Sequence, residues 1–238
     1  MLLLAAVALC GTADAAQVPV APSPSLDDLV DDPLDPADDA DAFLVSPSGD
    51  FRFDNFTFSA VPTGDFLPSM EDVFVTLTET ANSVMLLFQI AGKNLAAGPD
   101  AFEIQVGYDA HSLDPLNEFS GHTLFMNGVG LGDANVVINE EILAGGNELV
   151  GQLTTYSNLP NQGTQVIQST TYGSGQVTLA FDKDIALNGG TQNGNGVAFL
   201  SHFKETHHFE RIPEPSSVIL LALGGLGLGF VARSRRSA

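Results

Sequence analysis

Between residues 46 and 209 the chain consists of short runs rich in Val, Ile, Thr and Phe, separated by Gly, Asn, Asp and Pro. Short runs in which apolar and polar residues alternate are typical of β-strands that bury one face. The stretch has no long amphipathic helical pattern, and its closely spaced turn residues favour antiparallel strands over alternating strands and helices. The pattern predicts an all-β fold, an antiparallel, jelly-roll-like β-sandwich over residues 46–211.

Three runs give more detailed predictions. In 51–58, Phe recurs at alternate positions with a slip near Asn55, which predicts a strand with a bulge. Runs 73–80 and 84–90 flank a short turn and predict a hairpin. In the run 197–209, strand periodicity predicts one face with Phe199, Phe203, His207 and Phe209, and an opposite face with His202, Lys204, Thr206 and His208. Further strands are expected at 102–108, 122–127, 135–142, 148–156, 165–171 and 176–181.

The charge balance limits the classes of partner. The 238 residues include 29 Asp and Glu but only 8 Lys and Arg, for a formal net charge of -21. Nucleic-acid binding depends on Lys and Arg that neutralise phosphates, so no nucleic-acid partner is expected. The only cysteine, Cys10, lies in the N-terminal apolar run, so neither a disulfide framework nor a cysteine metal site is expected beyond it. No cofactor is predicted.

The N-terminus has the features of an export signal. Residues 2–10 form an apolar run too short to span a membrane, and Ala13-Asp14-Ala15 follows in a small-x-small pattern. We expect a signal peptide over residues 1–15, removed by signal peptidase at the site formed by Ala13 and Ala15. An alternative is a lipoprotein modified at Cys10, although Leu9 is not the small residue that usually precedes such a site.

The next segment, 16–45, is rich in Pro and Asp, a composition that predicts an extended, solvated linker. Clustered carboxylates outside the cell also suit calcium, which prefers oxygen ligands. The spacing does not match the calcium loop in which Asp residues alternate before a glycine. The candidate calcium ligands are Asp27, Asp28, Asp31, Asp32 and Asp35.

Candidate catalytic groups are few. His202, His207 and His208 lie close in sequence, but His202 and His208 would be about 20 Å apart along a strand, too far to share a metal ion. A metal site would need His111 or His122 alongside, so we interpret the histidines as partly exposed or membrane-proximal. Glu140 and Glu141 would point to opposite faces and are interpreted as a solvated strand end. The chain is predicted not to be an enzyme.

The C-terminal tail has three parts in a fixed order. Pro213, Glu214 and Pro215 precede an uncharged run, 216–232, and a basic cluster follows it. At about 1.5 Å per residue the run reaches about 25 Å, near the lower limit for a transmembrane helix. Basic residues next to a span stay on the cytoplasmic side, so the C-terminus is expected inside and the preceding residues outside. The basic cluster consists of Arg233, Arg235 and Arg236.

This order of triplet, Gly- and Leu-rich span and arginine cluster resembles the PEP-CTERM sorting signal of exported bacterial proteins. The resemblance covers residues 212–238. It implies that an exosortase-type membrane enzyme recognises Pro213, Glu214 and Pro215 and processes the tail during export. It also implies a final location at the cell surface or in the extracellular matrix, with a link to exopolysaccharide and biofilm.

The sequence therefore predicts an exported surface or matrix protein with a structural or adhesive role, associated with extracellular polysaccharide and held in the membrane by its C-terminal helix before processing. Two alternatives remain open. The sandwich and its many carboxylates also fit a secreted enzyme that acts on polysaccharide. The acidic segment also fits a calcium-stabilised adhesion module.

Overall fold

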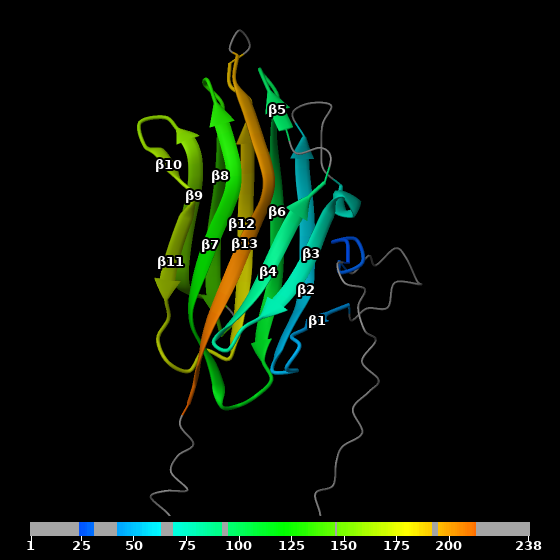
Figure 1. Cartoon of the computed structure of the whole chain (residues 1–238), viewed down its shortest axis with the longest axis vertical. Coiled ribbons are helices and arrows are strands. Elements are labelled where there is room, and N and C mark those ends of the chain that lie inside the picture. The colour runs from blue at the N-terminus through cyan, green and yellow to red at the C-terminus, as the bar shows by residue number, and fades with distance from the viewer. Residues whose placement is uncertain are drawn as a thin grey trace, which may run out of the picture.

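The computed structural model describes residues 24–30, 42–62, 69–91, 95–145, 147–191 and 195–212. Two antiparallel β-sheets pack face to face (Figure 1). The seven-stranded sheet has the order β1-β2-β6-β12-β8-β9-β10, and the six-stranded sheet has the order β11-β7-β13-β4-β3, with β5 also paired to β13. This arrangement confirms the antiparallel two-sheet prediction, while the jelly-roll connectivity stays a prediction.

The elements are β1 Leu44–Val45, β2 Phe51–Pro62, the 3-10 helix η1 Met70–Asp72, β3 Val73–Glu79, β4 Ser83–Ile90, β5 Leu95–Ala97, β6 Ala101–Ser112, β7 Asn117–Leu131, β8 Asn135–Ala144, β9 Glu148–Leu159, β10 Gly163–Gln165, β11 Ile167–Thr171, β12 Thr178–Asn188 and β13 Val197–Arg211.

Two local predictions are confirmed. The hairpin forms between β3 and β4, where the Thr80 amide donates a 2.8 Å hydrogen bond to the Ser83 carbonyl. The slip in the first Phe-rich run is a bulge, because the pairing of β2 with β6 shifts register between Asp54 and Thr57. Asn55 takes a φ of 52° at this point, a left-handed conformation that Asn tolerates better than most residues.

The central strand β13 differs from its predicted faces. Its pairing with β7 shifts register between Leu200 and His202, so residues before and after this point alternate out of phase. Phe199 consequently lies on the outer face and is 37% exposed, whereas Phe203 and His207 are buried. The prediction that Phe199 shares a face with these two residues is wrong.

Residues 24–30 also differ from the predicted solvated linker. Leu26 and Leu29 are buried in the core, and the Leu26 amide donates to the Val73 carbonyl. The Val75 amide donates to the Pro24 carbonyl, so this segment satisfies backbone groups along β3, the last strand of its sheet. The two leucines bury apolar surface, which the surrounding aspartates cannot do. The segment also covers the edge of the six-stranded sheet at β3.

The terminal predictions lie outside the described residues. These are the signal peptide 1–15 and the transmembrane helix 216–232. Among the residues that the structure describes, no helix has the length and apolar character to cross a membrane.

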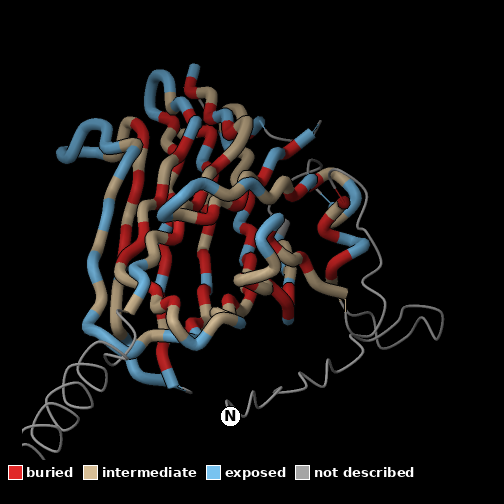
Figure 2. Tube along the Cα trace, turned by 60° about the horizontal axis from the view of Figure 1, so that its bottom comes forward, coloured by how far each residue is buried: buried red, intermediate tan, exposed pale blue. Residues whose placement is uncertain are grey.

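Buried and exposed residues alternate along the strands (Figure 2). The interior between the sheets is mostly aliphatic and aromatic, with Phe51, Phe53, Phe88 and Phe203 among the large buried side chains. It also holds several charged or titratable groups that are completely shielded from solvent: His122, Glu140, Lys183, Glu205 and His207, each 0% exposed. Because burial of an unpaired charge is costly, these groups must satisfy one another.

Candidate functional site

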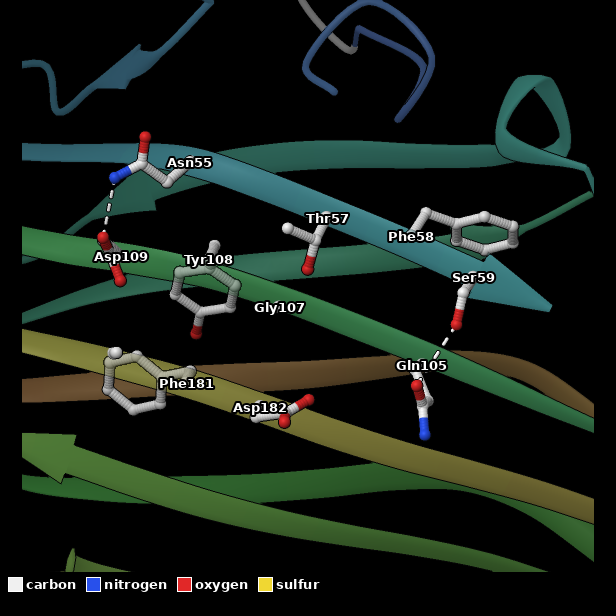
Figure 3. Close-up of a pocket in the computed structure, with 11 residues that line it drawn as sticks. Asn55, Thr57, Phe58, Ser59, Gln105, Gly107, Tyr108, Asp109, Phe181 and Asp182 are labelled. Atoms are coloured by element: carbon white, nitrogen blue, oxygen red, sulfur yellow. Dashed lines mark hydrogen bonds between the residues drawn. The ribbon is translucent and has the colours of Figure 1, made fainter. Parts of the chain in front are cut away.

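A pocket of about 380 Å³ opens on the seven-stranded sheet, over β2, β6 and β12 (Figure 3). Gln105 and Asp109 on β6 and Asp182 on β12 lie at alternate positions whose neighbours are buried, which places them on the outer face of the sheet. The lining residues are Asn55, Thr57, Phe58, Ser59, Gln105, Gly107, Tyr108, Asp109, Ala180, Phe181 and Asp182. Most of these offer amide, hydroxyl or carboxylate groups.

The bulge in β2 and a glycine in β6 shape this pocket. The bulge turns Asn55 so that its side-chain amide donates a 2.7 Å hydrogen bond to Asp109. Across the pocket, the Ser59 hydroxyl donates to Gln105 at 3.2 Å. Gly107 lies between these pairs, and a Cβ there would be only 2.6 Å from Thr57 Oγ1, so a larger residue would crowd the pocket.

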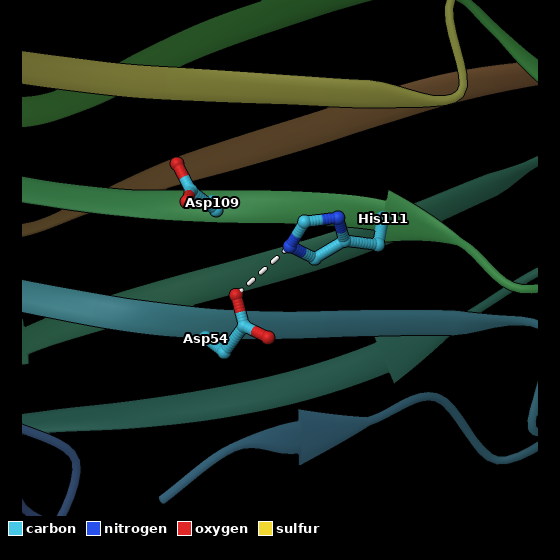
Figure 4. Close-up of side chains that lie close together, drawn as sticks. All are labelled: Asp54, Asp109 and His111. Carbon is cyan, nitrogen blue, oxygen red and sulfur yellow. Dashed lines mark hydrogen bonds and ion pairs between the residues drawn. The ribbon is translucent and has the colours of Figure 1, made fainter. Parts of the chain in front are cut away.

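A second polar group adjoins the pocket at Asp109. Asp54, Asp109 and His111 have ligand atoms within 4.8 Å of one another, a spacing that suits a metal ion (Figure 4). Asp54 already has two protein partners, however: Arg52 Nε at 2.7 Å and His111 Nε2 at 2.9 Å. These contacts explain how a carboxylate that is largely buried is satisfied without an ion.

The face around the pocket is acidic. Asp182 and Glu141 are directly paired neighbours on β12 and β8, and both are exposed. Burial and the nearby carboxylate of Glu103 raise the pKa of Asp184, two residues further along β12. Like charges in this arrangement repel one another and give the face a negative potential.

A separate polar network lies in the interior between the sheets. Lys183 Nζ on β12 is 3.2 Å from Glu140 Oε1 on β8 and 3.1 Å from Glu205 Oε1 on β13. On the other side of Glu140, its Oε2 is 3.0 Å from His122 Nε2 on β7. The Tyr108 hydroxyl on β6 donates to Glu205 Oε2. The network thus joins strands of both sheets.

The two buried carboxyls have different proton affinities. Burial raises the pKa of the Glu205 carboxyl, and the opposing attraction of Lys183 does not offset this. Burial also acts on Glu140, but His122 and Lys183 beside it outweigh burial and hold its pKa below the usual range. Compared with an ordinary carboxyl, Glu205 therefore holds its proton more readily and Glu140 loses its proton more readily.

His122, Glu140 and Glu205 also have the spacing of a metal site, since their ligand atoms lie within 4.8 Å of one another. Lys183 occupies the position between the two carboxyls, however, and its ammonium supplies the positive charge there. A metal ion would have to displace that side chain, so the residues present fit a lysine-centred network better than a metal centre.

The sequence interpretation of the histidines and glutamates needs correction. His207 and Glu140 were expected at partly exposed positions, but both are 0% exposed. His122 does fold alongside His207, with ring centroids 4.7 Å apart. The signal was present in the sequence, because charged residues occupy inward positions between apolar ones, as in Ile138-x-Glu140-x-Ile142 and Phe181-x-Lys183-x-Ile185.

The structure describes only part of the other predicted sites. Asp28 accepts hydrogen bonds from the Ser25 amide and hydroxyl at 2.8 and 2.7 Å, and Asp27 is exposed. Calcium binding by this segment stays a prediction. The remaining candidates lie outside the described residues: Ala13, Ala15, Asp31, Asp32, Asp35, Pro213, Glu214, Pro215, Arg233, Arg235 and Arg236.

Comparison with protein families confirms the sorting signal. Residues 211–236 match the PEP-CTERM protein-sorting motif, which indicates an exported protein that is membrane-anchored before an exosortase processes it. The match starts at Arg211, the last residue of β13. No curated protein matches the chain in sequence.

Several solved structures are similar to parts of the chain. The enzymatically active domain of tailspike protein 4 from bacteriophage CBA120 is 11% identical, with a TM-score of 0.26, and the match covers 63% of this chain and only 19% of that one. A DUF4465 family protein from Bacteroides caccae is 10% identical, with a TM-score of 0.26 over 63% of this chain and 91% of that one. A carbohydrate-binding module that recognises mannan is 10% identical, with a TM-score of 0.28 over 66% and 98%. Similarity at these TM-scores does not establish a shared fold or function.

Proposed function

We propose that this protein is a non-enzymatic component of the cell surface or extracellular matrix that binds polysaccharide through the pocket on the seven-stranded sheet. The pocket's polar lining is the observation that carries the proposal. The sorting motif supports the location, because an exported protein released from the membrane meets extracellular polymers. A role in biofilm follows as part of the same proposal.

The groups in the pocket suit a ligand rich in hydroxyls. The carboxylates of Asp109 and Asp182 accept hydrogen bonds, whereas the side-chain amides of Asn55 and Gln105 both donate and accept them. A sugar hydroxyl is likewise both a donor and an acceptor, so adjacent hydroxyls can bond to a carboxylate and an amide together. A few convergent polar groups of this kind are what fix a small ligand in a binding site.

The charge of the protein narrows the ligand class further. The chain carries a formal net charge of -21, and acidic residues line and surround the pocket. An anionic polymer rich in uronic acid or sulfate would be repelled by this face at low ionic strength. We therefore expect a neutral glycan.

The positions of the carboxylates support a binding role over glycoside hydrolysis. Hydrolysis needs a proton-donating carboxyl, with a raised pKa, that faces a second carboxyl across the substrate. Asp184, whose pKa is raised by burial and by the nearby Glu103, lies on this face but does not belong to the pocket lining. Within the pocket, Asp109 is engaged by the Asn55 amide.

Glycan binding can be tested on purified protein with soluble neutral glycans, such as mannans and glucans, alongside alginate as an anionic control. We expect saturable binding to at least one neutral glycan and none to alginate. Gln105→Ala should weaken this binding about tenfold, because it removes a hydrogen-bonding amide from the pocket. The matched control is Gln152→Ala on β9, which removes an exposed glutamine that does not line this pocket.

Two results would contradict the proposal. Equal loss of binding in the Gln105 and Gln152 variants would show that the pocket is not the site. Release of new reducing ends from any bound glycan would show that the protein is an enzyme.

A further inference from the structure

The interior network places an amine against two carboxyls in a space without solvent. Lys183 Nζ lies 3.1 Å from Glu205 Oε1 and 3.2 Å from Glu140 Oε1, and all three side chains are 0% exposed. Yet Lys183 Nζ makes no hydrogen bond of normal geometry among the described residues. The amine is therefore in close contact with both carboxyls but is not held as a well-formed donor to either.

A purely ionic network would be a costly way to fill this space. If both carboxyls were ionised, Lys183, Glu140 and Glu205 would together carry one excess negative charge in the core. The desolvation of buried ions often exceeds what their mutual attraction returns, even when they are paired. A reaction that removes charge from the network would therefore be favoured by its surroundings.

The two carboxyls are also prepared for different roles. When neighbouring titratable groups have proton affinities pushed apart, the group that stays ionised can act as a base and the group that stays protonated can act as an acid or electrophile. The lowered pKa of Glu140 suits the base, and the raised pKa of Glu205 suits the acid or electrophile.

From this geometry we propose that Lys183 and Glu205 condense to an intramolecular isopeptide bond that links β12 to β13. The Lys183 ammonium first gives a proton to the Glu140 carboxylate and becomes a neutral amine. Its nitrogen then attacks the carboxyl carbon of protonated Glu205, forming a carbon–nitrogen bond and a tetrahedral intermediate. Glu140 delivers its proton to the departing hydroxyl, which leaves as water, and takes up a proton from the nitrogen.

This sequence balances without a co-reactant. The ammonium, the Glu140 carboxylate and the Glu205 acid become an amide, one water and a protonated Glu140. The total charge is zero before and after, and nothing is oxidised or reduced.

The surrounding side chains favour the forward reaction. The Tyr108 hydroxyl donates to Glu205 Oε2, where negative charge develops in the intermediate. The aromatic rings of Tyr108 and Phe181 lie 4.3 and 5.3 Å from Lys183 Nζ and are themselves buried, so they exclude the water that would reverse the condensation. Groups held in contact in this way reach very high effective concentrations.

The bond is independent of glycan binding, because its residues point into the interior whereas the pocket opens on the outer face. It would connect the two sheets covalently, since β12 belongs to the seven-stranded sheet and β13 to the six-stranded sheet.

The test is the mass of the wild-type protein, purified after export. We expect a chain lighter by one water than its sequence between the experimentally determined ends. Proteolysis followed by tandem mass spectrometry should give a branched peptide in which Lys183 is joined to Glu205. An unmodified mass, or a branch that ends at Glu140, would overturn the proposal.

Variants test the roles of the residues. Lys183→Met should abolish the loss of water, whereas Lys204→Met, which removes a lysine on the outer face of β13, should retain it. Glu140→Gln should also abolish it, although both bonded residues remain, and Glu141→Gln should not. Retention of the bond in Glu140→Gln would refute the role of Glu140 as the base. If the core variants do not fold, the wild-type mass still decides whether the bond exists.

Discussion

The buried histidine of β13 makes the stability of the protein sensitive to mild acid. His207 is 0% exposed, and its Nε2 lies 3.0 Å from the Tyr108 hydroxyl. Because that hydroxyl donates to Glu205, it can accept a hydrogen bond from Nε2 of neutral His207. His207 Nδ1 has no hydrogen-bond partner among the described residues, so a second proton would be left unsatisfied in the core.

The electrostatic surroundings act in the same direction. Burial is the main reason why the pKa of His207 lies well below its ordinary value, and His122 on β7, Lys183 on β12 and the adjacent His208 lower it further. The unfolded chain protonates this imidazole at about pH 6.5, while the folded chain does not. Its contribution to stability is therefore complete above pH 6.5 and is lost as the pH falls.

The size of the effect follows from proton linkage. Each pH unit below about 6.5 should lower the free energy of unfolding by about 1.4 kcal/mol through His207 alone, until the folded-state pKa is reached. In chains where Glu205 is not joined to Lys183, this carboxyl has the opposite effect on the free energy of unfolding. Its raised pKa stabilises the folded chain at low pH, and this contribution is lost as the pH rises through the folded-state pKa. A comparison of wild type with a His207 variant separates the contribution of His207 from that of Glu205.

Urea unfolding at pH 7.5, 6.5 and 5.5 provides the assay. The difference in free energy of unfolding between wild type and His207→Gln should shrink by about 1.4 kcal/mol from the neutral plateau to pH 5.5, because the variant no longer carries the proton-sensitive group. His202→Gln removes a partly exposed histidine of the same strand and should leave the pH dependence unchanged. A difference between wild type and His207→Gln that is constant with pH, or an equal effect of His202→Gln, would refute the reasoning.

Two further predictions concern the ends of the described structure. Leu26→Ala should lower the free energy of unfolding by about 2 to 5 kcal/mol, because Leu26 is fully buried; a change within about 0.5 kcal/mol in urea unfolding would show that residues 24–30 are solvated instead. Replacement of Pro213, Glu214 and Pro215 by alanine should leave the tail from Arg233 onward on the exported protein, whereas wild type should lack it. Mass spectrometry of the C-terminus checks this, and an intact wild-type tail on surface-located protein would contradict processing at the triplet.

Local patterns in the sequence were enough to predict the architecture but not every strand face. Alternation and turn residues indicated the antiparallel strands, and the slip at Asn55 indicated the bulge of β2. The register shift between Leu200 and His202 had no comparable signal within its own run, where Ser201 is the residue between them. A bulge of this kind is set by pairing with the neighbouring strand, which a local pattern does not contain.

The candidate sites, like the strand faces, could be predicted from the sequence only in part. The inward positions of Glu140 and Lys183 follow from strand periodicity, but charged residues are rarely fully buried, which argued for a solvated strand end. Their burial depends on partners from other strands, as when Glu205 of β13 meets Lys183 of β12. The pocket likewise combines β2, β6 and β12, so its lining depends on the order of strands in the sheet.

The position of β13 has a mechanical consequence. The strand is hydrogen-bonded to β7 on one side and to β4 and β5 on the other, and its last residue, Arg211, begins the sorting motif. In Figure 1 it runs along the sheet toward the end of the described chain. Tension on an anchored tail would pull β13 along its length. The inter-strand hydrogen bonds lie perpendicular to the strands, so this force would load many of them in shear at the same time. The attachment to the membrane is thus made through a strand that is hydrogen-bonded to neighbours on both sides.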